Sequence, residues 1–290
     1  MSQDNHVRTF LGGSTEGTIV ENVTTRRLGE NDVFIKTTHS GLCGTDEHFL
    51  HGHQALGHEG VGVVKRICSS VTSVKVGDRV GFGFIRRVCG KCDNCISAPL
   101  LCAAASVWAC LTNNGIRPSD RVGVVGIGGL GHLAIKLAAA LGYNVVALSG
   151  SEKKQKEALE FRASEFYRFP STQGGVRIKP VKHLLLCGSS DVDYASLLVV
   201  DTNGVIYHIS VTLEPTPIPL VPFGQKGIRI QGCFITSRRN LQELLEFAAR
   251  HDIKPTIVTF PLTKNGLEEA FEELRAGSIR YRAVLEHRAL

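Results

Sequence analysis

The sequence lacks any long hydrophobic run. No stretch approaches the roughly 18 consecutive apolar residues of a membrane-spanning helix. The first residues, MSQDNHVRTFLGG, also lack the basic and apolar regions of a secretory leader. We therefore expect a soluble, cytoplasmic protein with no membrane partner.

Concentrated positive charge is equally scarce. The formal net charge is +6, but basic residues occur in no run longer than a pair, as at Lys153-Lys154 and Arg238-Arg239. Proteins that bind nucleic acid usually carry a basic patch or stripe, so we expect no nucleic-acid partner. Hydrophobic residues make up 43% of the chain and charged residues 21%, which indicates a folded core rather than disorder. A length of 290 residues favours two domains.

One stretch predicts a complete βαβ unit. Residues 121–150 read RVGVVGIGGLGHLAIKLAAALGYNVVALSG, where an apolar run passes through glycines into an amphipathic segment and then into a second apolar run. Gly142 follows the amphipathic segment and is expected to end the helix. Four apolar residues have the spacing of one helix face: Leu130, Ala134, Leu137 and Leu141.

The turn of this unit carries a dinucleotide-binding motif. Its glycines are Gly126, Gly128, Gly129 and Gly131. A side chain at Gly126 or Gly128 would hold the backbone away from a bound pyrophosphate, and Gly131 permits close packing of the helix on the sheet. The motif alone is weak evidence, but inside a βαβ unit it predicts dinucleotide binding at these glycines and at Leu130.

The remaining pattern divides the chain into two parts. Strands and helices alternate over 103–253, which predicts an α/β domain with a doubly wound parallel sheet. Residues 1–102 contain short, glycine-punctuated strands with the spacing of a barrel, and 254–290 are expected to return to that barrel. The predicted inward residues are Leu241, Leu244, Leu245 and Ala248 in a helix near 240, and Leu267, Ala270, Phe271 and Leu274 in a helix near 266.

Potential metal ligands are dense in residues 40–62, SGLCGTDEHFLHGHQALGHEGVG. Cys43 and His58 each lie beside a glycine-rich turn, and a thiolate with an imidazole is a donor set that suits zinc. A carboxylate such as Asp46 could hold the outer nitrogen of a ligating His58. The alternative is a surface loop with scattered histidines.

Nine cysteines in a chain expected in the cytoplasm argue for metal ligation or burial rather than for a disulfide framework. Four of them lie in apolar surroundings and are predicted to be small buried hydrophobic residues: Cys68, Cys110, Cys187 and Cys233.

Six motifs carry a resemblance to a known family. In order they are GLCGTDEH, GHEGVG, VGDRVG, CGKCDNC, APLLCA and VGIGGLGHLAIKLA. Together they resemble the zinc-dependent medium-chain alcohol dehydrogenases, most closely the NADP-using, cinnamyl-alcohol-type branch. The resemblance covers almost the whole chain and implies a truncated GroES-like β-barrel catalytic domain over 1–102 and 254–290. It also implies a Rossmann dinucleotide-binding domain over 103–253, with Zn²⁺ and NADP as cofactors. The implied partners are a small-molecule alcohol or aldehyde substrate and, as a candidate assembly, a second copy of the chain in a homodimer.

The resemblance also implies roles for individual residues. The catalytic zinc would be held by Cys43, His58 and Cys102, with Glu59 as an occasional fourth ligand. Three protein ligands leave one zinc position for substrate or water, as a catalytic site requires.

Two hypotheses of function follow. In the first, zinc polarises the oxygen of an alcohol or aldehyde and a hydride passes between the substrate carbon and the nicotinamide ring. Thr45 would relay the alcohol proton and His48 would pass it to solvent, as the resemblance implies. In the second, the protein binds a nucleotide without catalysis, because the truncated barrel no longer builds a substrate pocket.

Residues 89–102, CGKCDNCISAPLLC, depart from the family pattern. Cys89, Cys92 and Cys95 resemble the first three ligands of the structural zinc lobe of the family. The sequence then passes directly into APLLCA, so we predict an internal deletion that removes the fourth cysteine and several barrel strands. Cys102 could close a four-cysteine site instead, but its flanking residues match the catalytic motif and favour the catalytic role. A zinc-ribbon nucleic-acid module is disfavoured because no second cysteine pair accompanies the triplet.

The end of the second strand of the βαβ unit predicts a preference for NADP over NAD. In domains that bind NAD, an acidic residue at this position, roughly 20 residues beyond the glycines, binds the ribose 2′-hydroxyl. The sequence reads SGSEKK instead, and hydroxyls with a lysine can accept a phosphate. The predicted contacts are Ser149, Ser151 and Lys154, with Arg238 further along the chain. The alternative is that the two lysines merely begin a solvated helix.

Overall fold

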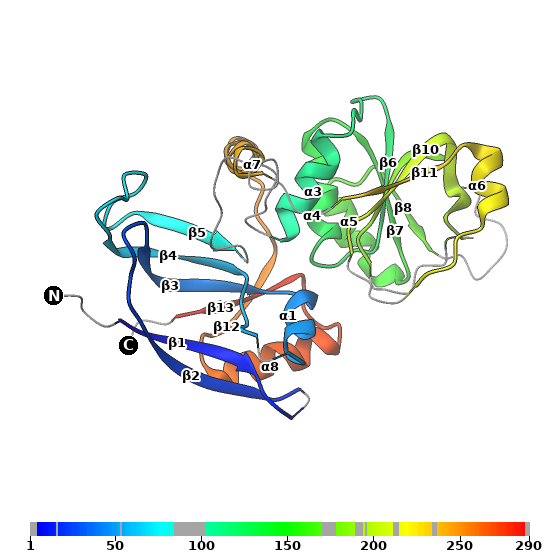
Figure 1. Cartoon of the computed structure of the whole chain (residues 1–290). Helices are drawn as coiled ribbons and strands as arrows, with labels where there is room; N and C mark the ends of the chain where they lie inside the picture. The colour runs from blue at the N-terminus through cyan, green and yellow to red at the C-terminus, as the bar shows by residue number, and fades with distance from the viewer. Residues whose placement is uncertain are drawn as a thin grey trace. The chain divides into compact units, whose positions relative to one another are not determined.

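The structure is a computed structural model, in which the chain forms two compact units (Figure 1). The first unit comprises Met1–Val88 with Thr256–Leu290, and the second comprises Cys89–Pro255. The predicted domain limits, 1–102 with 254–290 and 103–253, stay predictions. No helix in the part of the chain that the structure describes is long and apolar enough to cross a membrane. The described residues are 5–15, 17–52, 54–83, 102–169, 178–188, 194, 196–210, 215–233 and 237–287.

The second unit contains a parallel sheet. Among its described residues the strand order is β11-β10-β9-β6-β7-β8, and every pairing is parallel. The strand order reverses between β6 and β9, which confirms the predicted doubly wound topology. The strands are β6 (Arg121–Val125), β7 (Asn144–Ser149), β8 (Glu165–Arg168), β9 (Val181–Leu186), β10 (Val200–His208) and β11 (Arg229–Gly232).

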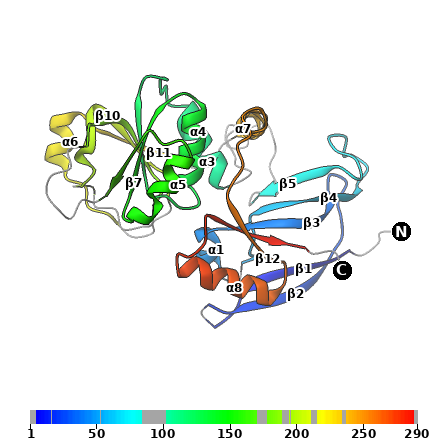
Figure 2. The same cartoon turned by 180° about the vertical axis from the view of Figure 1, so that it is seen from behind.

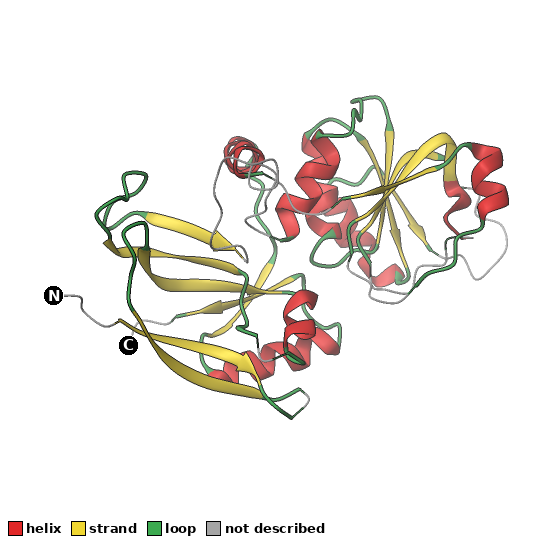
Figure 3. Cartoon of the chain, in the orientation of Figure 1, coloured by secondary structure: helices red, strands yellow, loops and turns green. Residues whose placement is uncertain are grey.

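Helices flank this sheet (Figure 3). Its central strands are apolar on both faces, as in β9, where Leu184, Leu185 and Leu186 are all buried. On one face, Phe223 of α6 joins a core with Leu184 and Leu186. The helices are α3 (Ala103–Thr112), α4 (Gly131–Ala140), α5 (Gln155–Glu160), α6 (Leu220–Lys226) and α7 (Arg238–Arg250), with short 3₁₀ turns η1 (Glu152–Lys154) and η2 (Ser196–Val199).

One of the four residues predicted to point inward from α7 does not do so. Leu244 is buried, but Leu245 is 57% exposed. Helix α7 packs against α3, where the ring centroids of Trp108 and Phe247 lie 4.9 Å apart. Successive residues of a helix are turned by about 100°, so a helix that directs Leu244 toward its neighbour turns Leu245 to solvent.

The first unit contains two sheets in its described part. One pairs β1 with β2, and the other has the order β12-β13-β3-β4-β5. In the larger sheet, β12 and β13 are parallel and the remaining pairs are antiparallel. The strands are β1 (Asn5–Gly12), β2 (Ile19–Arg26), β3 (Val33–Leu42), β4 (Glu59–Ile67), β5 (Arg79–Gly83), β12 (Ile257–Pro261) and β13 (Arg282–Glu286).

The C-terminal segment forms part of this unit. Strand β13 pairs with β3, and helix α8 (Lys264–Arg275) packs on the same core (Figure 2). Its residues Leu267, Ala270 and Phe271 are buried, and Leu274 is partly buried against them. A short helix, α1 (Gly44–Phe49), interrupts the strands of residues 1–102 and lies inside the ligand-rich stretch.

Candidate functional site

Cys43 caps the N-terminus of α1. Its backbone is extended, its sulfur accepts a hydrogen bond from the backbone N–H of Thr45 at 3.3 Å, and its own N–H donates to Asp46 Oδ2 at 3.0 Å. This reciprocal arrangement is a capping box, which supplies partners to backbone groups that the helix start leaves free. The local sequence therefore folds so that the thiol is held at the end of β3.

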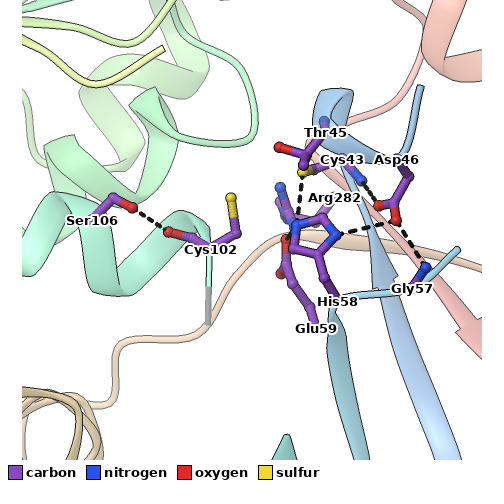
Figure 4. Close-up of polar contacts among 9 residues, drawn as sticks. All are labelled: Cys43, Thr45, Asp46, Gly57, His58, Glu59, Cys102, Ser106 and Arg282. Carbon is purple, nitrogen blue, oxygen red and sulfur yellow. Dashed lines mark hydrogen bonds and ion pairs between the residues drawn. The ribbon is translucent and has the colours of Figure 1, made fainter. Parts of the chain in front are cut away.

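Asp46 connects Cys43 to the second predicted ligand (Figure 4). Its carboxylate is completely buried and accepts hydrogen bonds from Cys43 N, Gly57 N at 2.8 Å and His58 Nδ1 at 3.1 Å. Because Nδ1 of His58 is occupied, Nε2 is the nitrogen that faces the thiol, at 3.2 Å from Cys43 Sγ. The expected contact between Asp46 and His58 is thus present, and one carboxylate orients both side chains.

Glu59 brings a third donor to this cluster. One of its oxygens lies 3.7 Å from His58 Nε2, and ligand atoms of Cys43, His58 and Glu59 all lie within 4.8 Å of one another. Arg282 of β13 forms an ion pair with Glu59. Burial raises the pKa of Glu59, and the neighbouring Arg282 opposes that rise. Sequence reasoning missed Arg282, because only the pairing of β13 with β3 and of β3 with β4 brings it here.

The electrostatics of this cluster favour a cation. Burial by itself lowers the pKa of His58, but its hydrogen bonds to Asp46 and Cys43 raise that pKa to about 10. Without a metal, His58 therefore holds a proton at neutral pH among acidic partners. A metal ion that binds Nε2 replaces that positive charge and releases the proton. Thiolate, imidazole and carboxylate together are a donor set that zinc accepts.

The two predicted proton-relay residues lie on α1. Thr45 is half-buried in its first turn, and His48 is exposed. Residues three apart in a helix share a face, so Thr45 and His48 lie on one face of α1, with His48 the more exposed of the two.

Cys102 belongs to the second unit. It directly precedes α3, is half-buried, and its carbonyl oxygen accepts a hydrogen bond from Ser106 Oγ at 2.7 Å (Figure 4). Cys89, Cys92 and Cys95 lie outside the described residues. The side chain of Arg238, a predicted cofactor contact, is likewise outside the described part of the chain.

Asp46 carries a direct prediction. We expect Asp46→Asn to lower zinc affinity by about 10- to 100-fold, because the amide no longer supplies negative charge or fixes the orientation of His58. Competition with a metal-sensitive dye measures the affinity. The matched control is Asp78→Asn, whose carboxylate accepts a hydrogen bond from the N–H of Lys75 in a turn. Equal zinc affinity in both variants would show that Asp46 has no part in ligand orientation.

The glycine turn of the second unit lies at the carboxyl ends of β6 and β9. A Cβ at Gly131 would meet the carbonyl oxygen of Gly126 at 1.8 Å, so the helix start packs directly on the turn. A Cβ at Gly128 would meet no atom within 4 Å, which leaves open space where a ligand can approach. Gly126 is required for a second reason besides the approach of a ligand. Its φ is +87°, and a Cβ there would meet the backbone of Gly188 at 2.5 Å.

Three of the predicted phosphate contacts lie close to this turn. Lys154 is half-buried and its Nζ donates to the carbonyl oxygen of Ile127 at 2.7 Å. Ser149, at the end of β7, is buried and its Oγ accepts a hydrogen bond from Ser151 N at 3.3 Å. Lys153, in contrast, is exposed. The two lysines therefore differ in exposure. Only Lys153 is exposed as expected for a lysine that merely begins a solvated helix.

Two family models match overlapping parts of the chain. The family model described as alcohol dehydrogenase GroES-like domain matches residues 29–139, and the zinc-binding dehydrogenase model matches residues 129–250. A similar relative is the NADP-dependent alcohol dehydrogenase C 1 of Mycolicibacterium smegmatis, 29% identical with 96% of each chain covered. An alcohol dehydrogenase of Geobacillus stearothermophilus is 28% identical over 92% of this chain and 95% of its own.

Solved structures share the fold. A cinnamyl alcohol dehydrogenase from Sorghum bicolor has a TM-score of 0.89 at 24% identity, covering 97% of this chain and 98% of its own. The CAD of Helicobacter pylori, solved with NADP(H), has a TM-score of 0.87 at 21% identity, covering 98% of this chain and 99% of its own. These likenesses confirm the predicted pairing of a GroES-like domain with a Rossmann sheet.

The same comparisons bear on the predicted deletion. The alignment with the M. smegmatis relative is 338 residues long, although this chain has 290 residues. The relative therefore contains residues that have no counterpart here.

Proposed function

The chain belongs to the zinc-dependent medium-chain alcohol dehydrogenase family, and from that premise we propose that it transfers a hydride between NADP(H) and a primary alcohol or aldehyde. The observation that carries the proposal is the buried cluster of Cys43, His58 and Glu59, oriented by Asp46 within a GroES-like domain. The NADP-dependent relative supports the cofactor assignment.

The residues of this cluster fit a zinc ion. We assign Cys43, His58 and Cys102 as its ligands, with Glu59 close enough to His58 to serve as an alternative donor. The assignment of Cys102 rests on its motif, APLLCA, and on the family. Bound zinc would polarise the substrate oxygen and stabilise negative charge on it.

The chain itself would supply the path for the proton. The Thr45 hydroxyl would relay the proton of the alcohol, taking it up while passing on its own, and His48, exposed on the same helix, would pass a proton to solvent. Proton transfer by positioned side chains contributes about 100- to 10,000-fold in typical enzymes. Asp46 takes no proton in this scheme; it holds Cys43 and His58 in place.

A second zinc position is proposed at the cysteine triplet. Cys89, Cys92 and Cys95 would hold a structural ion, and the missing fourth cysteine requires that a water or another side chain complete the coordination. Measured zinc content per chain, before and after replacement of Cys92, distinguishes a filled triplet from an empty one.

Lys154 carries a prediction about cofactor choice. We expect tighter binding of NADPH than of NADH, and we expect Lys154→Gln to weaken NADPH binding by roughly 10- to 100-fold, because a charged hydrogen bond to phosphate contributes about 1.5–3 kcal/mol. NADH binding should change little. Titration by cofactor fluorescence measures both affinities. Lys153→Gln is the matched control, since Lys153 is exposed. Tighter binding of NADH to the unaltered chain would overturn the assignment.

An assay of alcohol-dependent NADPH formation, combined with zinc analysis, tests the function as a whole. Turnover that follows zinc content supports the oxidoreductase. Cofactor binding without turnover supports the alternative, a nucleotide-binding protein derived from this family.

A further inference from the structure

Two cysteines that the proposed reaction does not use meet inside the second unit. Cys110 lies in the last turns of α3 and is completely buried, whereas Cys233 directly follows β11 and is half-buried. The thiol of Cys110 is in hydrogen-bond contact with the sulfur of Cys233, and both cysteines are free. The prediction of a buried hydrophobic residue is confirmed for Cys110 and Cys187 but wrong for Cys233 and for Cys68, which are half-buried.

Asn114 adds a polar contact to this pair. Its Nδ2 donates to the carbonyl oxygen of Cys110 at 2.9 Å and to the sulfur of Cys233 at 3.9 Å. The sulfur of Cys233 therefore receives hydrogen bonds from a thiol and from an amide. A small hydrophobic filler needs no such donors, whereas a thiolate is stabilised by them.

The two thiols differ in their ionisation. The hydrogen bond from Cys110, helped by that from Asn114, lowers the pKa of Cys233 against the effect of burial. Burial raises the pKa of Cys110. Cys233, the less buried of the two residues, is thus the one that ionises more readily, and Cys110 keeps its proton.

We propose that Cys110 and Cys233 form a peroxide-sensitive dithiol pair that closes reversibly to a disulfide within the second unit. The Cys233 thiolate attacks hydrogen peroxide, breaks the O–O bond and becomes a sulfenic acid, while hydroxide leaves. The sulfur of Cys110 then attacks the sulfur of Cys233. The S–O bond breaks, and the thiol proton of Cys110 leaves with the hydroxyl group as water. The two sulfurs lose two electrons in total and the peroxide gains them.

This arrangement has the features of a redox-sensing cysteine. Such cysteines combine thiolate character, access to solvent and a resolving thiol in contact. Cys187 provides an internal contrast, because it is buried and its burial raises its pKa to about 12. The structure therefore separates a reactive pair from a third cysteine in the same unit.

The test uses the native, zinc-loaded chain. It is treated with increasing hydrogen peroxide, free thiols are blocked, and peptides are mapped by mass spectrometry without reduction. We expect a peptide linked through Cys110 and Cys233 at peroxide concentrations that leave Cys68 unmodified, and its loss on treatment with dithiothreitol. Absence of this peptide from the unaltered, folded protein, or oxidation of Cys68 first, would overturn the proposal. This arm needs no variant to fold.

Variants then assign the order of the steps. Cys110→Ser should accumulate a sulfenic acid at Cys233, which dimedone traps, whereas Cys233→Ser should leave Cys110 unmodified. The matched control, Cys187→Ser, should form the linked peptide as readily as the unaltered chain. A sulfenic acid on Cys110 in the Cys233→Ser variant would contradict the proposed assignment of the attacking thiol.

Discussion

Replacing Cys43 by Ser is expected to remove the catalytic zinc and abolish turnover while NADPH binding remains intact. A serine hydroxyl stays protonated at neutral pH and is a poor zinc ligand, whereas a cysteine thiolate is a strong one. Zinc binding in structural sites contributes about 10–16 kcal/mol. If four ligands share this free energy, the loss of one ligand lowers the zinc affinity by roughly 100-fold or more.

The substitution separates ligation from folding. Serine is a favoured N-cap residue and can accept the hydrogen bond that Cys43 accepts from Thr45. Helix α1 should therefore persist, and the unfolding midpoint should change little. Cys68→Ser is the control for the loss of a half-buried thiol in the same unit. Zinc content and turnover that survive in Cys43→Ser would show that the family assignment of this ligand is wrong.

Restoring the missing family segment between the cysteine triplet and Cys102 is expected to raise kcat/KM by about 100-fold or more. The segment would lie just before the APLLCA motif that contains Cys102, and misplacement of a reacting group by about 1 Å can cost roughly that factor. Strand β5 lies at one end of the described five-stranded order, next to β4. Loss of neighbouring strands leaves edge N–H and C=O groups without sheet partners and uncovers apolar side chains. Val61 of β4, for example, is 39% exposed.

Restoring the segment should not alter NADPH binding by the second unit. The strands of the second unit form a continuous parallel order in the described residues, and their core is closed on both faces. We therefore expect equal NADPH affinity in the short chain and in the chain with the segment restored. Equal turnover in the two forms would show that the absent strands are dispensable.

Local patterns explain why much of the fold was predictable. The βαβ unit at 121–150 is specified by residues close in sequence, so its strands, its helix and the positive φ of Gly142 follow from short-range rules. The pairing of Cys43 with His58 is also local, because Asp46 bonds both across one short helix and one turn. The sequence indicated that carboxylate as a partner of His58, but not its bonds to Cys43 and Gly57.

Long-range contacts explain what the sequence did not reveal. Arg282 reaches Glu59 only because β13 adds to the sheet beside β3, and no periodicity near either residue signals that pair. Leu245 has the right spacing for an apolar face, but the position of α3 decides which face is covered. Cys233 looks like a core residue in the sequence, although its contacts with Cys110 and Asn114 are polar.

The most direct test of the proposed function is aldehyde-dependent oxidation of NADPH by the zinc-loaded chain, measured beside Cys43→Ser at equal cofactor saturation. We predict slow turnover that requires zinc in the unaltered chain and none in the variant. NADPH binding with no turnover of any alcohol or aldehyde by the zinc-loaded chain, or equal turnover in both proteins, would contradict a catalytic zinc at Cys43 and His58.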